Sequence, residues 1–182
     1  MNLKQRSVDV YIPDATPITL KRRDLEFLKE KVSATSRKRI RICIHTSDND
    51  LIHEMFIVNR YDTYIRPHKH LHKKESYHVI EGKADIILFD EKGSIQNIIP
   101  LGDFASGKDF YYKLNDPIYH TMVIHSEYLV FVEVTNGPFR KDDNIFAPWS
   151  PDEKDTQAVK AYLRKLKQDL RIFLSLHKRK AL

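Results

Sequence analysis

The chain has 182 residues, 41% of them hydrophobic, which is typical of one compact domain with additional structure at its ends. Its single cysteine, Cys43, excludes an internal disulfide framework and favours a reducing compartment. The first residues contain no apolar segment of the secretory type, and apolar runs such as 86–89 and 128–132 are too short to span a bilayer. We therefore expect a cytoplasmic protein without a membrane span.

The formal net charge of +6 comes from one part of the chain. Residues 154–182 contain nine lysines and arginines against two aspartates, so the remainder of the chain is close to neutral. Such a stripe is more typical of a solvated helix face than of a nucleic-acid or membrane surface. We therefore expect no nucleic-acid partner.

The first predicted element is a short amphipathic helix within residues 20–33, where Leu25, Leu28 and Val32 recur at helical spacing. Residues 37–47 then show the period of a strand, because isoleucines at positions 40, 42 and 44 alternate with polar neighbours. We assign residues 1–36 to an N-terminal arm that includes the short helix.

The middle of the chain is a succession of short segments rich in β-branched and aromatic residues. These are HEMFIVN (53–59), SYHVI (76–80), KADIILFD (83–90), SIQNIIP (94–100), FYYKL (110–114), HTMVI (120–124) and YLVFVEV (128–134). Residues 90–93 suit a hairpin, since Gly93 can take a positive φ. Strands without intervening helices predict an all-β core, an antiparallel barrel or sandwich, over residues 37–149.

After residue 149 the pattern becomes helical. Residues 150–153, Ser-Pro-Asp-Glu, match a capping box with proline at the first helical position. The apolar positions that follow at helical spacing are Val159, Tyr162, Leu163, Leu166, Leu170, Phe173 and Leu174. We expect residues 150–182 to form a long, basic amphipathic helix that packs on the β core or on a second subunit. We also expect a homodimer, for which this helix and the isoleucines of residues 40–44 offer apolar surface.

Residues 66–75, Arg-Pro-His-Lys-His-Leu-His-Lys-Lys-Glu, carry the strongest chemical signal. Residues two apart on a strand share a face, so His68 and His70 can both point into a barrel, and Glu75 can enter from the next strand. His120, which opens a distant strand, is the best candidate for a fourth ligand. Imidazole and carboxylate ligands suit Fe, Mn, Ni, Zn or Cu better than Ca or Mg. We therefore expect one divalent transition metal.

The alternative interpretation is a solvated loop, because nine histidines make chance His-x-His pairs unsurprising. The full spacing from the histidine pair through Glu75 to Gly82, within an all-β context, favours the metal site. We regard His72, His78, His125 and His177 as bystanders. Strand parity predicts that His78 points opposite to Glu75.

The spacing around His68, His70 and Glu75 resembles the first cupin motif, and the region of His120 resembles the second. Further segments resemble the WbuC family of cupin-fold metalloproteins. These are RICIH (41–45), IRPHKH (65–70), LFDEKG (88–93), HT (120–121), NGPF (136–139) and FAPWSPDE (146–153). The resemblance runs from about residue 20 to residue 155. It implies an antiparallel, jelly-roll-like cupin barrel, a bound metal, and an association with surface-polysaccharide (O-antigen) synthesis.

Polar residues near the expected ligands are candidates for substrate binding. They are Arg41, Tyr64, Arg66 and Trp149. An arginine beside a metal can bind a carboxylate or phosphate through two hydrogen bonds, but it can equally bond backbone carbonyls at a barrel end. If Glu75 binds metal, catalysis needs a separate base, for which His45 and Tyr77 are the candidates.

Three functions are compatible with these residues. The first is an enzyme of carbohydrate metabolism, an isomerase, epimerase or lyase acting on a sugar or nucleotide sugar, with the metal as Lewis acid. It rests on the family resemblance. The second is a non-catalytic, metal-dependent module that binds a small molecule. The third is an Fe(II)-dependent dioxygenase, because three histidines and one glutamate also suit oxygen chemistry.

Overall fold

The computed structural model of the protein describes residues 2–178, with side chains described through residue 176. The elements in chain order are β1 (Leu3–Ser7), β2 (Val10–Pro13), α1 (Arg22–Val32), β3 (Arg39–Cys43), β4 (Ile52–Arg60), β5 (His68–His70), β6 (Glu75–Glu81), β7 (Lys83–Phe89), β8 (Ile95–Gly102), β9 (Tyr111–Leu114), β10 (Tyr119–Ile124), β11 (Tyr128–Asn136), β12 (Asn144–Phe146) and α2 (Thr156–Lys178). Two short 3₁₀ helices, η1 (Phe104–Ser106) and η2 (Lys141–Asp143), lie in loops.

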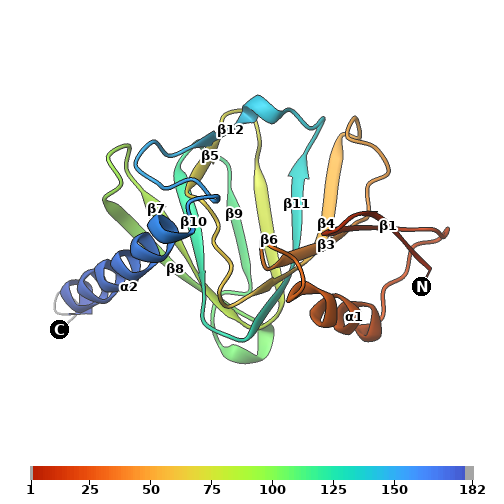
Figure 1. Cartoon of the computed structure of the whole chain (residues 1–182), viewed down its shortest axis with the longest axis horizontal. Coiled ribbons are helices and arrows are strands. Elements are labelled where there is room, and N and C mark those ends of the chain that lie inside the picture. The colour runs from red at the N-terminus through yellow and green to blue at the C-terminus, as the bar shows by residue number, and fades with distance from the viewer. Residues whose placement is uncertain (1, 179–182) are drawn as a thin grey trace.

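The strands form two sheets that enclose the interior of the molecule (Figure 1). The first sheet has the order β1-β2-β3-β4-β11-β6-β9, and the second has the order β12-β5-β10-β7-β8. The central orders β4-β11-β6-β9 and β5-β10-β7-β8 are those of a jelly roll, an architecture that includes the cupins. The predicted all-β, jelly-roll-like core with one helix near each end is therefore confirmed. Its hydrogen bonds form two separate sheets instead of one closed barrel.

The core between the sheets is built from alternate residues of facing strands. Ile57, Tyr77 and Phe131 of the first sheet pack against Ile86 and Met122 of the second. The longest pairing in the molecule joins β4 to β11 along their whole lengths. The hairpin expected at residues 90–93 joins β7 to β8, and Gly93 has a φ of 89°. Within each strand, alternate residues therefore face the interior between the sheets.

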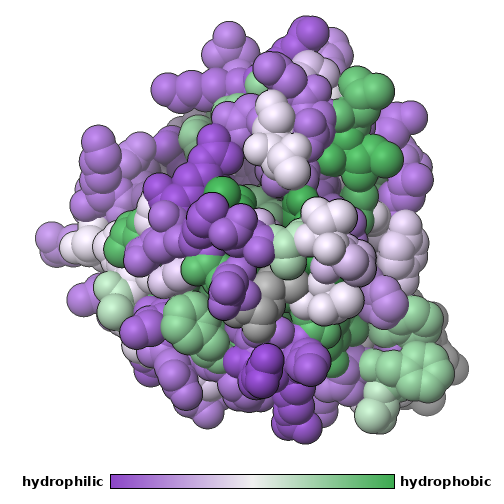
Figure 2. Space-filling model, turned by 90° about the vertical axis from the view of Figure 1, so that its right-hand side faces the viewer, coloured by the Kyte–Doolittle hydropathy of each residue, from purple (hydrophilic) through white to green (hydrophobic). Residues whose placement is uncertain are grey.

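Helix α1 covers the outer face of the first sheet, where Leu28 and Val32 pack on Ile40 and Ile42. The isoleucines expected to offer a dimer surface are therefore buried within the chain. The arm before α1 also differs from expectation, because it forms β1 and β2, and β2 pairs in parallel with β3. The face of the molecule on this side is mostly hydrophilic (Figure 2).

Helix α2 begins at Thr156, so the capping box expected at residues 150–153 is wrong. The Ser150 hydroxyl donates to the Ala147 carbonyl instead, at 2.7 Å, and the Asp155 carboxylate accepts from the Ala158 amide at 2.9 Å. The middle of α2 packs on the second sheet through Leu166 and Leu170.

Beyond that contact the helix projects from the body of the molecule (Figure 1). Three apolar side chains of its last turns are 40–54% exposed, namely Ile172, Leu174 and Leu176. The apolar stripe predicted for this helix is therefore covered only in part. Within residues 2–178, neither helix combines the length and the apolar character that crossing a membrane requires.

Candidate metal centre

The four side chains expected to bind metal lie close together between the two sheets. His68 and His70 lie on β5 and His120 lies opposite His68 on β10, whereas Glu75 opens β6 in the other sheet. Ligand atoms of the three histidines lie within 4.8 Å of one another. Glu75 Oε1 lies 2.8 Å from His120 Nε2, and Glu75 Oε2 lies 3.2 Å from His70 Nε2. The three imidazoles therefore form a cluster that could hold a metal ion, and the Glu75 carboxylate contacts two of them.

The other ring nitrogen of each histidine is held by an oxygen acceptor. His68 Nδ1 lies 2.9 Å from the Arg66 carbonyl oxygen, and His120 Nδ1 lies 2.9 Å from that of Ile118. His70 Nδ1 lies 2.6 Å from Asn144 Oδ1. Because these oxygens can only accept, each Nδ1 carries the proton and each Nε2 can turn a lone pair inward. Metal-binding histidines are oriented in this way.

The ionisation of the cluster also fits a bound cation. Burial lowers the pKa of His68 to about 3, so its ring is neutral. Burial opposes ionisation of Glu75 too, but the neighbouring His120 and His70 hold the pKa of its carboxyl well below the usual range. Although Glu75 Oε1 and His120 Nε2 lie close together, neither makes an aligned hydrogen bond within the described part of the chain. Burial also opposes protonation of His120, but the Glu75 charge raises the pKa of its ring, so a metal bound there would have to displace a proton from His120.

Tyr77 lies beside this cluster as a hydrogen-bond donor. Its hydroxyl donates to Glu75 Oε2 at 2.8 Å. Burial and the adjacent Glu75 charge raise the pKa of Tyr77 well above 10. A phenol that stays protonated at neutral pH positions the Glu75 carboxylate and is a poor proton acceptor.

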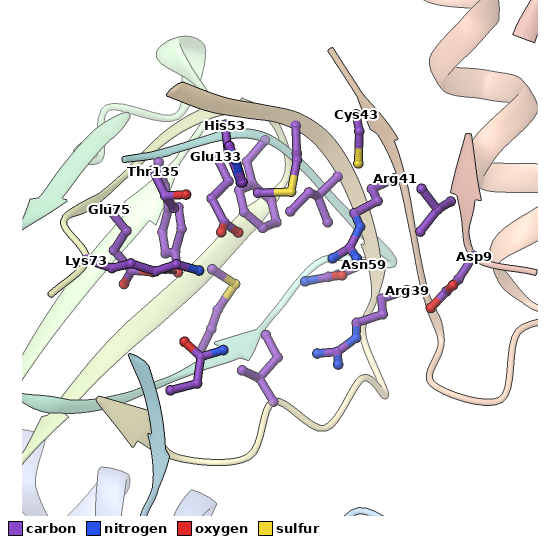
Figure 3. Close-up of a pocket in the computed structure, with 18 of the residues that line it drawn as sticks. Asp9, Arg39, Arg41, Cys43, His53, Asn59, Lys73, Glu75, Glu133 and Thr135 are labelled. Atoms are coloured by element: carbon purple, nitrogen blue, oxygen red, sulfur yellow. Dashed lines mark hydrogen bonds between the residues drawn. The ribbon is translucent and has the colours of Figure 1, made fainter. Parts of the chain in front are cut away.

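A cavity of about 510 Å³ opens from the cluster toward the edge of the first sheet (Figure 3). Of the other residues expected to act on a substrate, Arg41, His45 and Tyr77 line this cavity. Burial lowers the pKa of His45, whose ring stacks on that of His53 with centroids 4.2 Å apart. The cavity has the size of small-molecule sites in proteins.

The structure places Tyr64, Arg66 and Trp149 outside the cavity lining. Tyr64 donates to the Pro151 carbonyl at 3.0 Å, and Arg66 bonds to Ser150 and to the Asp152 carboxylate. The Trp149 ring packs on Phe89 and Tyr119 and lies against Gly93. These three side chains join the β core to the segment that precedes α2.

The cavity also contains Glu133, to which no motif spacing points. Its register opposite Tyr77 on the neighbouring strand places it on the same inward face as Glu75. Burial, with the nearby Glu75 charge, raises the pKa of Glu133 to about 7. One signal for it exists in the sequence, because strand parity puts the only acid of YLVFVEV on the face of Phe131.

Fold and site together define a jelly-roll protein with an interior histidine cluster that could hold a metal ion. Residues 20–101, less than half of the chain, match a family described as "Domain of unknown function (DUF6016)". No curated protein matches the sequence.

Several solved structures resemble the chain at low identity. One is a Klebsiella pneumoniae protein with a double-stranded beta-helix domain, at 15% identity and a TM-score of 0.47 over 64% of this chain and 88% of that one. A Shewanella oneidensis protein has 13% identity and a TM-score of 0.46 over 57% and 66%. Bacillus subtilis oxalate decarboxylase has 19% identity and a TM-score of 0.43 over 53% of this chain and only 24% of its own. The function of this chain must therefore be inferred from its own residues.

Proposed function

We propose that the protein is a metal-dependent enzyme that acts on a sugar or nucleotide sugar, as an isomerase, epimerase or lyase. The observation that carries the proposal is the position of the histidine cluster, whose Nε2 atoms face a cavity of substrate size that also contains ionisable groups. A divalent metal bound by His68, His70, His120 and Glu75 would supply Lewis acidity to a carbonyl or to vicinal hydroxyls. The resemblance of residues 41–45, 65–70 and 146–153 to WbuC proteins supports a place in surface-polysaccharide synthesis.

Reactions of this class move a proton at a carbon next to a carbonyl, so the chain must provide a base. Glu133 is suited to that task, because its carboxyl faces the cavity and its pKa of about 7 lets it accept and return a proton near neutral pH. His45, which is neutral because burial lowers its pKa, is the second candidate, at the far side of the same cavity.

The test is turnover by protein purified without a histidine tag. Metal-loaded protein is incubated in D₂O with a panel of nucleotide sugars, and deuterium incorporation or product formation is followed by NMR. We expect Glu133→Gln to abolish incorporation while leaving metal content unchanged. Binding without turnover would indicate the non-catalytic module instead, and oxygen consumption with Fe(II) would indicate the dioxygenase.

A further inference from the structure

Cationic side chains reach into the cavity at a distance from the metal centre. Arg39 and Arg41 lie two residues apart on β3 and point inward from one side, and Lys73 points inward from the other (Figure 3). Arg39 pairs with Glu153 at 3.5 Å. Arg41 and Lys73 have no ion-pair partner among the residues whose side chains are described. Two cations therefore line the cavity without a salt bridge to any described residue.

Buried polar atoms line the cavity between these cations and the metal centre. Asn59 Oδ1, Thr135 Oγ1 and His53 Nε2 have no hydrogen-bond partner within the described residues, and their side chains belong to residues only 2–4% exposed. Buried polar atoms are nearly always paired, so each of these needs a ligand or an ordered water. Strand register places Asn59 opposite Arg39, and Thr135 opposite Glu75. The unpaired atoms thus run from the arginines to the metal ligands.

The acidic side chains that line the cavity do not neutralise its arginines and lysine. Asp48 and Asp9 lie at the mouth, where Asp48 pairs with Arg6 at 3.7 Å and Asp9 accepts from Ser7 at 2.7 Å. Glu133 is the acid that faces the interior beside Tyr77, and among the described residues it makes no salt bridge with Arg41 or Lys73. An anion within the cavity therefore has Arg41 and Lys73 as cationic partners that no salt bridge engages.

We propose that the substrate is a polyhydroxylated acid, a sugar bearing a carboxylate or a phosphate, whose anionic group binds to Arg41, with Lys73 as the second cation that attracts it. Its hydroxyl groups pair with Asn59, Thr135 and His53, and its other end reaches the metal ligands. Strands β3 and β6 are three interstrand spacings apart, about 14 Å, and the arginine side chains span part of that distance. A hexose with one charged substituent fits the distance that remains between the arginine side chains and the metal ligands. This inference rests on the proposed function for the metal end, while other residues form the anion site.

Calorimetric titration of the metal-loaded protein tests the anion site with three probes: D-glucose, D-glucuronate and D-glucose 6-phosphate. The two acids separate a carboxylate source from a phosphate source. We expect at least one acid to bind about ten-fold or more tightly than glucose, because charge-assisted hydrogen bonds contribute that much. Arg41→Gln should remove this advantage and leave glucose binding and metal content unchanged. Arg171→Gln, an exposed arginine on α2, is the matched control and should change nothing.

Lys73→Gln provides a second variant, since Lys73 lies in the turn between β5 and β6 and its replacement disturbs no strand. It should also weaken binding of the acids relative to glucose. Equal affinity for acids and glucose, affinities for the acids unchanged in both variants, or no binding of either acid by fully metal-loaded protein would overturn the inference. Failure of the wild-type protein to load metal would instead overturn the proposed function.

Discussion

Each histidine of the cluster depends on an acceptor as much as on its own position. The two backbone carbonyls that hold His68 and His120 come from residues two positions earlier in the chain, so these rings are oriented by the segments that lead into their strands. His70 is different, because its acceptor is the Asn144 side chain from β12. Substitution of Asn144 can therefore disturb the orientation of His70 without removing any of the expected metal ligands.

The first residue-scale prediction concerns metal content. Protein purified without a histidine tag should carry about one equivalent of a divalent transition metal, because three histidines cluster in the interior and a carboxylate contacts two of them. His68→Ala combined with His70→Ala should abolish loading. His72→Ala, an exposed histidine of the adjacent turn, should load normally. Elemental analysis measures all three, and equal metal in the double variant would contradict the assignment.

Asn144→Ala should lower metal affinity by about 10–100-fold, the usual effect of removing a partner of a ligand histidine. The His70 ring would lose the acceptor of its Nδ1 proton and could rotate away from Glu75. Competition with a chelator measures the affinity. Asn49→Ala, in an exposed loop, is the control, and similar affinities in the two variants would show that Asn144 does not orient His70.

Glu133 makes stability depend on pH in metal-free protein. Its pKa rises from 4.5 when exposed to about 7 in the fold, so the folded state holds a proton that the unfolded state has released. This stabilisation is complete below about pH 4.5 and is lost as the pH rises through 7. Between pH 5 and pH 8 the melting temperature of the wild type should therefore fall more steeply with rising pH than that of Glu133→Gln. Parallel curves would mean that Glu133 titrates normally.

At the scale of elements, helix α2 has two halves with different environments. Leu166 and Leu170 are buried on the second sheet, whereas Ile172, Leu174 and Leu176 are exposed. The two buried leucines should contribute about 1.5–3 kcal/mol each. The two halves of α2 should therefore differ in their contribution to stability.

Truncation after Asp155 should lower the melting temperature clearly, and truncation after Leu174 should lower it less, because it leaves Leu166 and Leu170 in place. Neither should alter metal content, because the ligands lie in β5, β6 and β10. Differential scanning calorimetry with elemental analysis checks both. A truncation after Asp155 with unchanged stability would show that α2 is not packed on the sheet.

What the sequence could predict among these elements follows from periodicity. Alternation around Ile40 and Ile42 and in residues 53–59 and 128–134 predicts β3, β4 and β11, since each strand has one buried face. The polar stretch Leu3–Ser7 gives no such signal, because β1 is an edge strand that is mostly exposed. The start of α2 was mispredicted because Ser150 and Asp152 bind Arg66, a contact between residues distant in sequence.

The candidate site likewise contains residues that the sequence can predict and residues that it cannot. Spacing identifies His68, His70 and Glu75, since parity alone sets their direction. It cannot identify Asn144 or the unpaired Asn59, whose roles depend on which strands become neighbours.

For the molecule as a whole, burial of Ile40 and Ile42 under α1 means that, of the two apolar surfaces expected for the homodimer, the end of α2 is the one that stays exposed. Light scattering at micromolar concentration should show a dimer for the full chain and a monomer for Ile172→Ser combined with Leu176→Ser. Leu51→Ser, at a side chain 77% exposed elsewhere, should remain dimeric. A monomeric wild type would contradict this prediction.

The pairing of β4 with β11 has a consequence for biosynthesis. Residues 52–60 find their partner on that side only when residues 128–136 have left the ribosome. The histidines on β5 likewise meet His120 only after residue 120 has been synthesised. Such distant pairings form slowly, because long loops must close before any contact compensates for the lost chain entropy. The nascent chain consequently lacks the complete histidine cluster until synthesis has passed residue 120, well beyond the midpoint of the chain.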